Sequence, residues 1–205
     1  MKKVTITSIA AFMLFVVFTA FAPAGGYQVG ESVKDFKLKN VDGKTMSLAD
    51  NKAAKGFIVV FTCNHCPFSK MYESRIMSLN DMYASKGYPV IAINPNDKNE
   101  VPDDSYENMQ ALAKEKGYKF PYLYDETQEV AAAFGAARTP HVFIVVKEKD
   151  KLVLKYIGAI DDNAEDGKMA DEKYVENAMN QIIAGKPVTE SMTKAVGCTI
   201  KWKKS

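Results

Sequence analysis

Phe61-Thr62-Cys63-Asn64-His65-Cys66-Pro67 is the stretch of sequence that decides the fold. It ends the apolar run 56–62, which is rich in β-branched residues and is typical of a strand buried on both faces. After Cys66, apolar side chains recur at helical spacing, at Phe68, Tyr72, Ile76, Leu79 and Tyr83. The order is therefore a buried strand, two cysteines spaced C-x-x-C, and a helix.

This arrangement predicts redox chemistry at the cysteine pair. A helix N-terminus has unpaired backbone N–H groups and partial positive charge, so a thiolate placed there is stabilised. We expect Cys63 to be the nucleophile, with a pKa below the usual ~8.5 of a free thiol. Cys66, about one turn further on, is the expected resolving thiol, in a disulfide with Cys63. A protonated His65 between them would lower the pKa of Cys63 further, and Pro67 suits the first helical turn.

Two cysteines at this spacing also occur as half of a zinc site. The remaining thiol and imidazole side chains are Cys198, His65 and His141, and no second C-x-x-C or H-x-x-x-H pattern is present. We therefore expect no metal site and no cofactor. A copper or zinc carrier that uses cysteine and histidine ligands is the non-enzyme alternative, since two thiolates suit Cu(I).

Apolar patterns along the rest of the chain predict alternating strands and helices. Strands are expected at 88–94, 122–124, 141–146 and 152–158, and helices at about 105–117, 126–134 and 171–184. An Asp42-Gly43 turn signal within 36–48 predicts an N-terminal β-hairpin. Such alternation predicts an α/β fold, with a central mixed sheet and helices on both faces.

The chain resembles the thioredoxin superfamily, in its peroxiredoxin-like or alkyl hydroperoxide reductase–thiol-specific antioxidant (redoxin) branch. The resemblance covers about residues 27–200 and is carried by the segments 57–67, 122–135 and 138–143. It implies a thioredoxin-like fold. It also implies that Pro140 is cis and faces the cysteines, and that Thr139 offers its backbone to a substrate peptide as part of a groove.

The activity that follows from this resemblance is thiol–disulfide exchange with protein thiols and disulfides and with an unidentified redox partner. Arg138 is an accessory candidate that could stabilise the thiolate. A thiol peroxidase is the second reading, in which Cys63 reduces a hydroperoxide and Cys66 or Cys198 resolves the sulfenic acid. Cys198 itself is either a buried small apolar residue or a third redox thiol.

The sequence departs from both family patterns. The strand 56–62 lacks the buried carboxylate that relays a proton in thioredoxins, which leaves water, or a group such as Glu73, Asp97 or Lys98, as the relay. Peroxiredoxins have a proline and a threonine at set spacings before their reactive cysteine, whereas here Thr62 directly precedes Cys63. The missing carboxylate and His65 together predict a reduction potential above the thioredoxin value of about −270 mV.

The N-terminus reads as a targeting segment. Lys2 and Lys3 precede an apolar run that ends near Ala22-Pro23-Ala24, so we expect residues 1–24 to be a signal peptide or an uncleaved membrane anchor. We expect residues 25–205 to form one redoxin domain that is periplasmic or otherwise exported. Without the leader the chain has 25 basic and 25 acidic residues, which argues against nucleic-acid binding. Membrane contact is expected only if the segment is retained.

Overall fold

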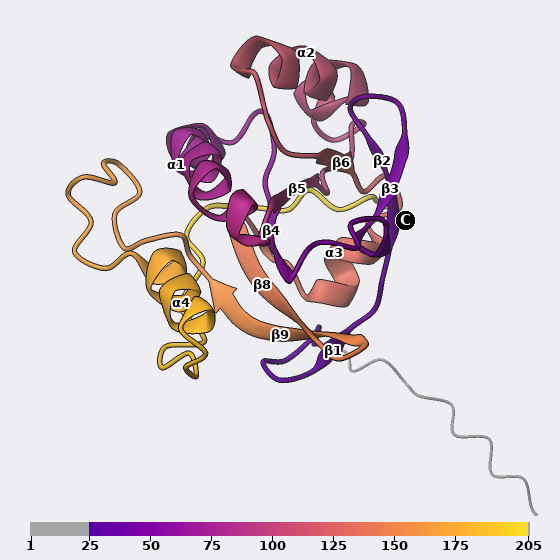
Figure 1. Ribbon diagram of the computed structural model, residues 1–205. Helices are drawn as coiled ribbons and strands as arrows, with labels where there is room; N and C mark the ends of the chain where they lie inside the picture. The colour runs from indigo at the N-terminus through magenta and orange to yellow at the C-terminus, as the bar shows by residue number, and fades with distance from the viewer. Residues whose placement is uncertain (1–24, 205) are drawn as a thin grey trace, which may run out of the picture.

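The computed structural model describes residues 25–204 (Figure 1), so the expected signal segment lies outside the described residues. An 8-stranded sheet forms the centre of the molecule, in the order β1-β9-β8-β4-β5-β6-β2-β3. In that order the strands are Ser32–Val33, Lys151–Gly158, His141–Glu148, Gly56–Phe61, Val90–Asn94, Tyr122–Tyr124, Lys37–Asn40 and Thr45–Ser47.

The sheet is mixed around its central strand β4. Strands β5 and β6 continue it in parallel, whereas on the other side β8 runs antiparallel to β4, and β9 runs antiparallel to β8. The expected N-terminal hairpin is confirmed: β2 and β3 pair antiparallel, and β2 also pairs with β6 at this end of the sheet. Because β4 and β5 are parallel neighbours, the loops that follow them meet at the same edge of the sheet.

Helices cover both faces of the sheet (Figure 1), as expected. The helices are α1 (Pro67–Tyr83), α2 (Tyr106–Lys116), α3 (Glu129–Phe134) and α4 (Tyr174–Ile183), with the 3-10 helices Leu48–Asp50, Ala84–Lys86 and Pro102–Asp104. Side chains alternate along β4, so that Ile58 and Val60 pack with α1, α2 and α4, while Val59 and Phe61 pack with α3. This alternation explains why every residue of β4 is apolar or glycine and buried.

The structure differs from the sequence expectation in several places, among them the start of α4, which is at Tyr174 rather than at 171. Helix α3 begins at Glu129 rather than at 126, while the Asp125 carboxylate accepts the backbone N–H of Ala131 at 2.7 Å. A second, two-stranded sheet was not expected, in which β10 (Cys198–Thr199) pairs antiparallel with β7 (Arg138–Thr139). Among the described residues, each helix is too short or too polar to span a membrane.

Candidate active site

The cysteine pair lies where strand β4 gives way to helix α1. Cys63 follows the strand by two positions, and Cys66 is the residue before the helix, whose first residue is Pro67. Cys63 is 4% exposed and Cys66 is fully buried. The local order of strand, cysteines and helix is therefore confirmed.

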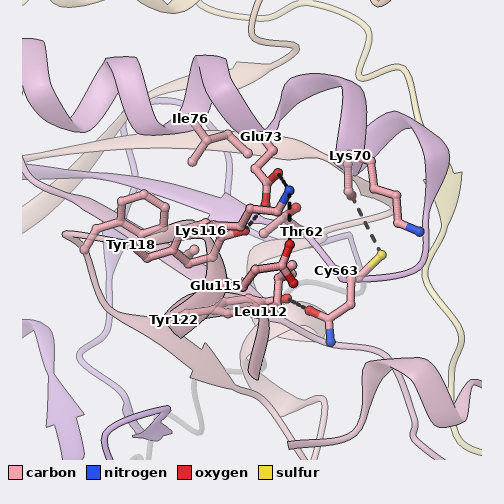
Figure 2. Close-up of a pocket in the computed structure, with 14 residues that line it drawn as sticks. Thr62, Cys63, Lys70, Glu73, Ile76, Leu112, Glu115, Lys116, Tyr118 and Tyr122 are labelled. Atoms are coloured by element: carbon pink, nitrogen blue, oxygen red, sulfur yellow. Dashed lines mark hydrogen bonds and ion pairs between the residues drawn. The ribbon is translucent and has the colours of Figure 1, made fainter. Parts of the chain in front are cut away.

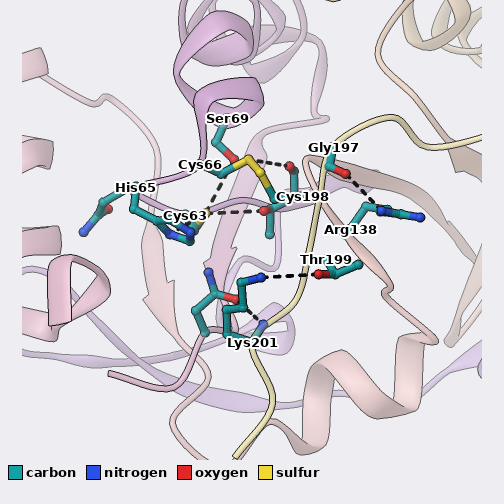
Figure 3. The surroundings of a disulfide bond; sticks show 12 residues. Cys63, His65, Cys66, Ser69, Arg138, Gly197, Cys198, Thr199 and Lys201 are labelled. Carbon is teal, nitrogen blue, oxygen red and sulfur yellow. Dashed lines mark hydrogen bonds between the residues drawn. A yellow bond between two sulfur atoms is a disulfide. The ribbon is translucent and has the colours of Figure 1, made fainter. Parts of the chain in front are cut away.

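The disulfide in this structure joins Cys66 to Cys198, with Cα atoms 6.2 Å apart, and Cys63 is a free thiol (Figure 3). This corrects the expected Cys63–Cys66 pairing. The cause is the pairing of β10 with β7, which places Cys198 directly opposite Thr139. The carbonyl oxygen of Thr139 lies 3.3 Å from the sulfur of Cys66, the residue before α1. The interpretation of Cys198 as a buried apolar residue is also wrong, because it is half-buried and bonded to Cys66.

Polar groups surround the Cys63 sulfur. Thr139 Oγ1 is 3.3 Å from Sγ, His65 Nδ1 is 3.6 Å away and Ser69 Oγ is 3.7 Å away. Burial nevertheless raises the pKa of the Cys63 thiol above its usual value, and the negative charge of Asp104 raises it further. Hydrogen bonds from Thr139, the Cys66 backbone and Ser69 act in the opposite direction. The expected lowering of this pKa is therefore wrong for the form with the Cys66–Cys198 disulfide.

Asp104 is the residue at this site that the sequence reading missed. Its carboxylate is fully buried, with Oδ2 2.5 Å from His65 Nδ1. Oδ1 accepts the backbone N–H groups of Asn64 at 2.7 Å and His65 at 3.2 Å, and Oδ2 also accepts from the Asn96 amide at 2.7 Å. One carboxylate thus fixes the backbone between the two cysteines and the ring of His65.

The Thr139–Pro140 peptide bond is cis, as expected. Thr139 is fully buried, and its backbone pairs with the chain's own β10. The edge assigned to a substrate peptide is therefore filled in this form, and the groove role of Thr139 and Pro140 stays a prediction for a form without β10. Arg138 is exposed and donates to the Gly197 carbonyl at 3.2 Å, so it holds β10 instead of reaching the Cys63 thiolate.

Comparison with known proteins fits this geometry. Residues 29–154, more than half of the chain, match the AhpC/TSA family. The chain belongs to the AhpC/TSA family. This membership confirms the resemblance to the redoxin branch of the thioredoxin superfamily.

This AhpC/TSA chain is similar to the following three proteins. Thiol-disulfide oxidoreductase ResA of Bacillus thuringiensis (strain Al Hakam) is 27% identical over 141 residues, 67% of this chain and 75% of the relative. An uncharacterized conserved protein from Geobacillus kaustophilus is 40% identical with a TM-score of 0.79, over 87% of this chain and 94% of its own. A putative thioredoxin from Neisseria meningitidis is 25% identical with a TM-score of 0.50, over 64% and 81%. The thioredoxin-like fold is thereby confirmed.

A pocket of about 350 Å³ adjoins Cys63 between α1 and α2 (Figure 2). Glu73, one of the expected relay groups, lies in it, and its carboxylate accepts from Tyr118 Oη at 2.6 Å and pairs with Lys116 Nζ at 3.4 Å. Its recorded polar partners thus lie away from the sulfur atoms. Among the described residues that line the pocket, none belongs to β7 or β10.

Among the described residues, the other two expected relay groups have no hydrogen bond to a cysteine sulfur in this AhpC/TSA chain. Asp97 is buried but binds Asn99, and Lys98 is exposed. Asp104 replaces them as the nearby carboxylate. The segment that carries it follows β5, the parallel neighbour of the strand that leads to Cys63, so the two segments meet at one edge of the sheet.

Cys63, His65 and Asp104 each have a metal-type donor atom, and these atoms lie within 4.8 Å of one another. Both Asp104 oxygens already accept hydrogen bonds, however, and a set of three is one short of the four ligands of a structural zinc site. The geometry therefore fits a hydrogen-bonded thiol–imidazole–carboxylate set better than the metal carrier.

Proposed function

We propose that this oxidoreductase is an exported thiol–disulfide exchange enzyme in which Cys63 attacks and Cys66 resolves. The observation that carries the proposal is the half-cystine Cys66 at the start of α1, beside a free Cys63 thiol. The ResA relative bears the name of the same activity, and membership of the AhpC/TSA family fits it. Protein thiols and disulfides are the substrates that this chemistry implies.

In the reductive direction, the Cys63 thiolate attacks one sulfur of a substrate disulfide. A Cys63–substrate bond forms, and the other substrate sulfur leaves as a thiolate and takes up a proton. Cys66, as a thiolate, then attacks Cys63 Sγ, so that a Cys63–Cys66 disulfide forms and the second substrate thiol is released. His65 Nδ1 lies 3.6 Å from Cys63 Sγ and 2.5 Å from Asp104 Oδ2, so its N–H group, held by the carboxylate, lies beside the sulfur where it can stabilise a Cys63 thiolate.

Export is the part of the proposal that rests on the sequence alone. The basic and apolar segment 1–24 has the pattern of a leader or anchor. A disulfide next to the reactive thiol also suits a compartment in which disulfides persist.

The test is reduction of a disulfide-linked peptide by the reduced protein. We expect Cys63→Ser to abolish turnover, and Cys66→Ser to accumulate a mixed disulfide between Cys63 and the peptide that mass spectrometry detects. Asn51→Ser, a substitution on the loop before β4 and far from the cysteines in sequence, is the control for handling and folding. Full turnover by Cys63→Ser would overturn the proposal.

A thiol peroxidase is the second candidate, and the pocket beside Cys63 favours it. In that reaction the Cys63 thiolate takes one oxygen from a hydroperoxide, the alcohol leaves, and Cys66 displaces water from the sulfenic acid to form a disulfide. Trapping of a sulfenic acid on Cys63 in the Cys66→Ser/Cys198→Ser double variant, together with catalytic peroxide consumption, would favour it over exchange with proteins.

A further inference from the structure

The C-terminal segment 191–203, here called the strap, crosses the active site as an extended chain (Figure 1, yellow). It is anchored on both sides of the cysteines. On one side the backbone N–H of Ile157 donates to the Ser191 carbonyl at 3.0 Å. On the other, the N–H of Lys201 donates to Asn96 Oδ1 at 2.8 Å, and Ile200 is buried in the core beside α3. Only the short span between these anchors lies over the sulfur atoms.

Within this span, β10 occupies the edge that an incoming peptide would use. Strand β7 is two residues long and, among the described strands, has β10 as its partner. Thr139 contributes its backbone to this pairing, opposite Cys198. An extended peptide that reaches these cysteines gains main-chain hydrogen bonds only by adding to such an edge. The strap therefore holds a cysteine in the place of a peptide substrate.

Thr139 contacts the sulfur atoms of both Cys63 and Cys66. Its Oγ1 lies 3.3 Å from Cys63 Sγ and its carbonyl oxygen lies 3.3 Å from Cys66 Sγ. Cys66 Sγ is bonded in turn to Cys198. Thr139 thus contacts the free thiol and one sulfur atom of the disulfide, and the second sulfur atom is bonded to the first.

We propose that Cys198 is a third redox cysteine and that the strap is a tethered internal substrate of the exchange reaction. The Cys63 thiolate attacks Cys66 Sγ, a Cys63–Cys66 bond forms, and the Cys66–Cys198 bond breaks. Cys198 leaves as a thiolate and takes up a proton, which balances the proton lost by Cys63, so no external oxidant or reductant is consumed. This inference rests on the proposed function in one respect, namely that Cys63 is the attacking thiol.

The two disulfide isomers differ in what they offer to a partner. With Cys66–Cys198 bonded, the edge of β7 is covered and Cys63 is buried. With Cys63–Cys66 bonded, the middle of the strap is held by hydrogen bonds alone, so a cysteine-containing peptide is able to displace it from β7. The edge of β7 therefore becomes available to a partner only in the isomer that has the reactive Cys63–Cys66 disulfide.

Gly197 gives a way to loosen the strap without touching a cysteine. A Cβ atom at this position would lie 2.2 Å from the Thr139 carbonyl oxygen, so Gly197→Ala cannot dock β10 as the structure shows it. Val196 is 42% exposed, which makes Val196→Ala the matched control in the same strap.

The experiment measures which thiol is free in the oxidised protein with one intramolecular disulfide. Exchange is quenched with acid, the free thiol is alkylated under denaturing conditions, and peptide mapping gives the ratio of free Cys63 to free Cys198. We expect free Cys63 to predominate in the wild type. Gly197→Ala should shift the ratio toward free Cys198 by about tenfold or more, the range expected for a backbone overlap, and Val196→Ala should leave it unchanged.

Two further variants keep the test decisive. If Gly197→Ala does not fold, Arg138→Gln removes only the hydrogen bond to the Gly197 carbonyl and should shift the ratio in the same direction by less. Cys63→Ser should hold all of the disulfide as Cys66–Cys198. The inference is overturned if Cys66–Cys198 fails to form in Cys63→Ser, or if the ratio does not respond to loosening of the strap. The proposed function fails separately, if Cys63→Ser still reduces peptide disulfides.

Discussion

His65 Nδ1 lies 2.5 Å from Oδ2 of Asp104, a fully buried carboxylate that follows a different strand of the sheet. The same ring nitrogen is 3.6 Å from Cys63 Sγ. Any charge on His65 is thus opposed by a carboxylate of fixed position. This pair governs the reactivity of Cys63, because Asp104 raises the pKa of the thiol while it holds the imidazole ring beside the sulfur.

Removal of the carboxylate should make Cys63 more acidic. We expect Asp104→Asn to lower the pKa of the thiol, since the nearest negative charge is lost, while an amide oxygen still accepts backbone N–H groups. Stability should fall by about 1–3 kcal/mol, because part of a buried hydrogen-bond set is lost. Thiolate absorbance against pH measures the first effect and denaturant unfolding the second. The neighbouring exposed Asp103, changed to Asn, is the control, and an unchanged titration in Asp104→Asn would contradict the prediction.

The oxidised protein should show slow alkylation of Cys63 at neutral pH. Burial raises the pKa of this thiol, so the midpoint of the rise in alkylation rate with pH should lie above about pH 8.5, where an ordinary cysteine is half ionised. Rates with a small alkylating reagent, compared with those of free cysteine, measure this. A rate that levels off below about pH 8.5 would instead support the lowered pKa expected from the sequence.

His141 should make folding sensitive to acid. Burial lowers its pKa from 6.5 to about 4 in the folded protein, so the unfolded chain binds a proton more readily in this range. The contribution of His141 to the free energy of unfolding is fully present above pH 6.5. It decreases as the pH falls, and about 3 kcal/mol has been lost once the pH is below 4. His141→Asn keeps an acceptor near the Ala137 N–H but does not titrate, so its unfolding free energy should fall less between these pH values.

The chain's other histidine supplies the control for that measurement. His65→Asn should keep the acid-induced loss of stability that His141 causes. If His141→Asn and the wild type lose stability equally between pH 7 and pH 4, the loss comes from carboxyl groups and the role of His141 is wrong.

The elements with local patterns were predictable from the sequence. The apolar run 56–62 and the helical spacing after Cys66 appear in the structure as β4 and α1 with shifts of a residue. These patterns are set by which face each side chain buries, and that information lies within a few residues. The cis peptide before Pro140 came from family resemblance, because nothing in the local residues distinguishes it from a trans bond.

Long-range partners were not predictable. The Cys66–Cys198 bond joins residues 132 positions apart, and it depends on the path that the chain takes after α4. Asp104 ends the 3-10 helix Pro102–Asp104, in a stretch that reads as an ordinary helix start, and its role arises only because β5 lies beside β4. Both follow from topology, since sequence spacing alone does not show which loops meet at one edge of a sheet.

The buried carboxylate of Asp104 changes the reduction potential that we expect for the Cys63–Cys66 couple. The sequence predicted a value above the thioredoxin potential of about −270 mV, partly because no buried carboxylate was found. A carboxylate near Cys63 destabilises the thiolate and therefore the reduced form, which lowers the potential. We therefore expect the reduction potential of the Cys63–Cys66 couple to be about −270 mV rather than about −200 mV.

This measurement needs a background with one intramolecular disulfide couple, which Cys198→Ser provides. At alkaline pH, where the thiolate is populated, Asp104→Asn in this background should raise the potential by about 30 mV for each unit by which the pKa of Cys63 falls, since both correspond to about 1.4 kcal/mol. Equilibration with glutathione at several ratios measures it, with Asp103→Asn as the matched control. A potential that stays constant while the thiol titration moves would show that Asp104 acts on the disulfide form as strongly as on the thiolate. A fall in potential would show that its hydrogen bonds to Asn64 and His65, rather than its charge, set the couple.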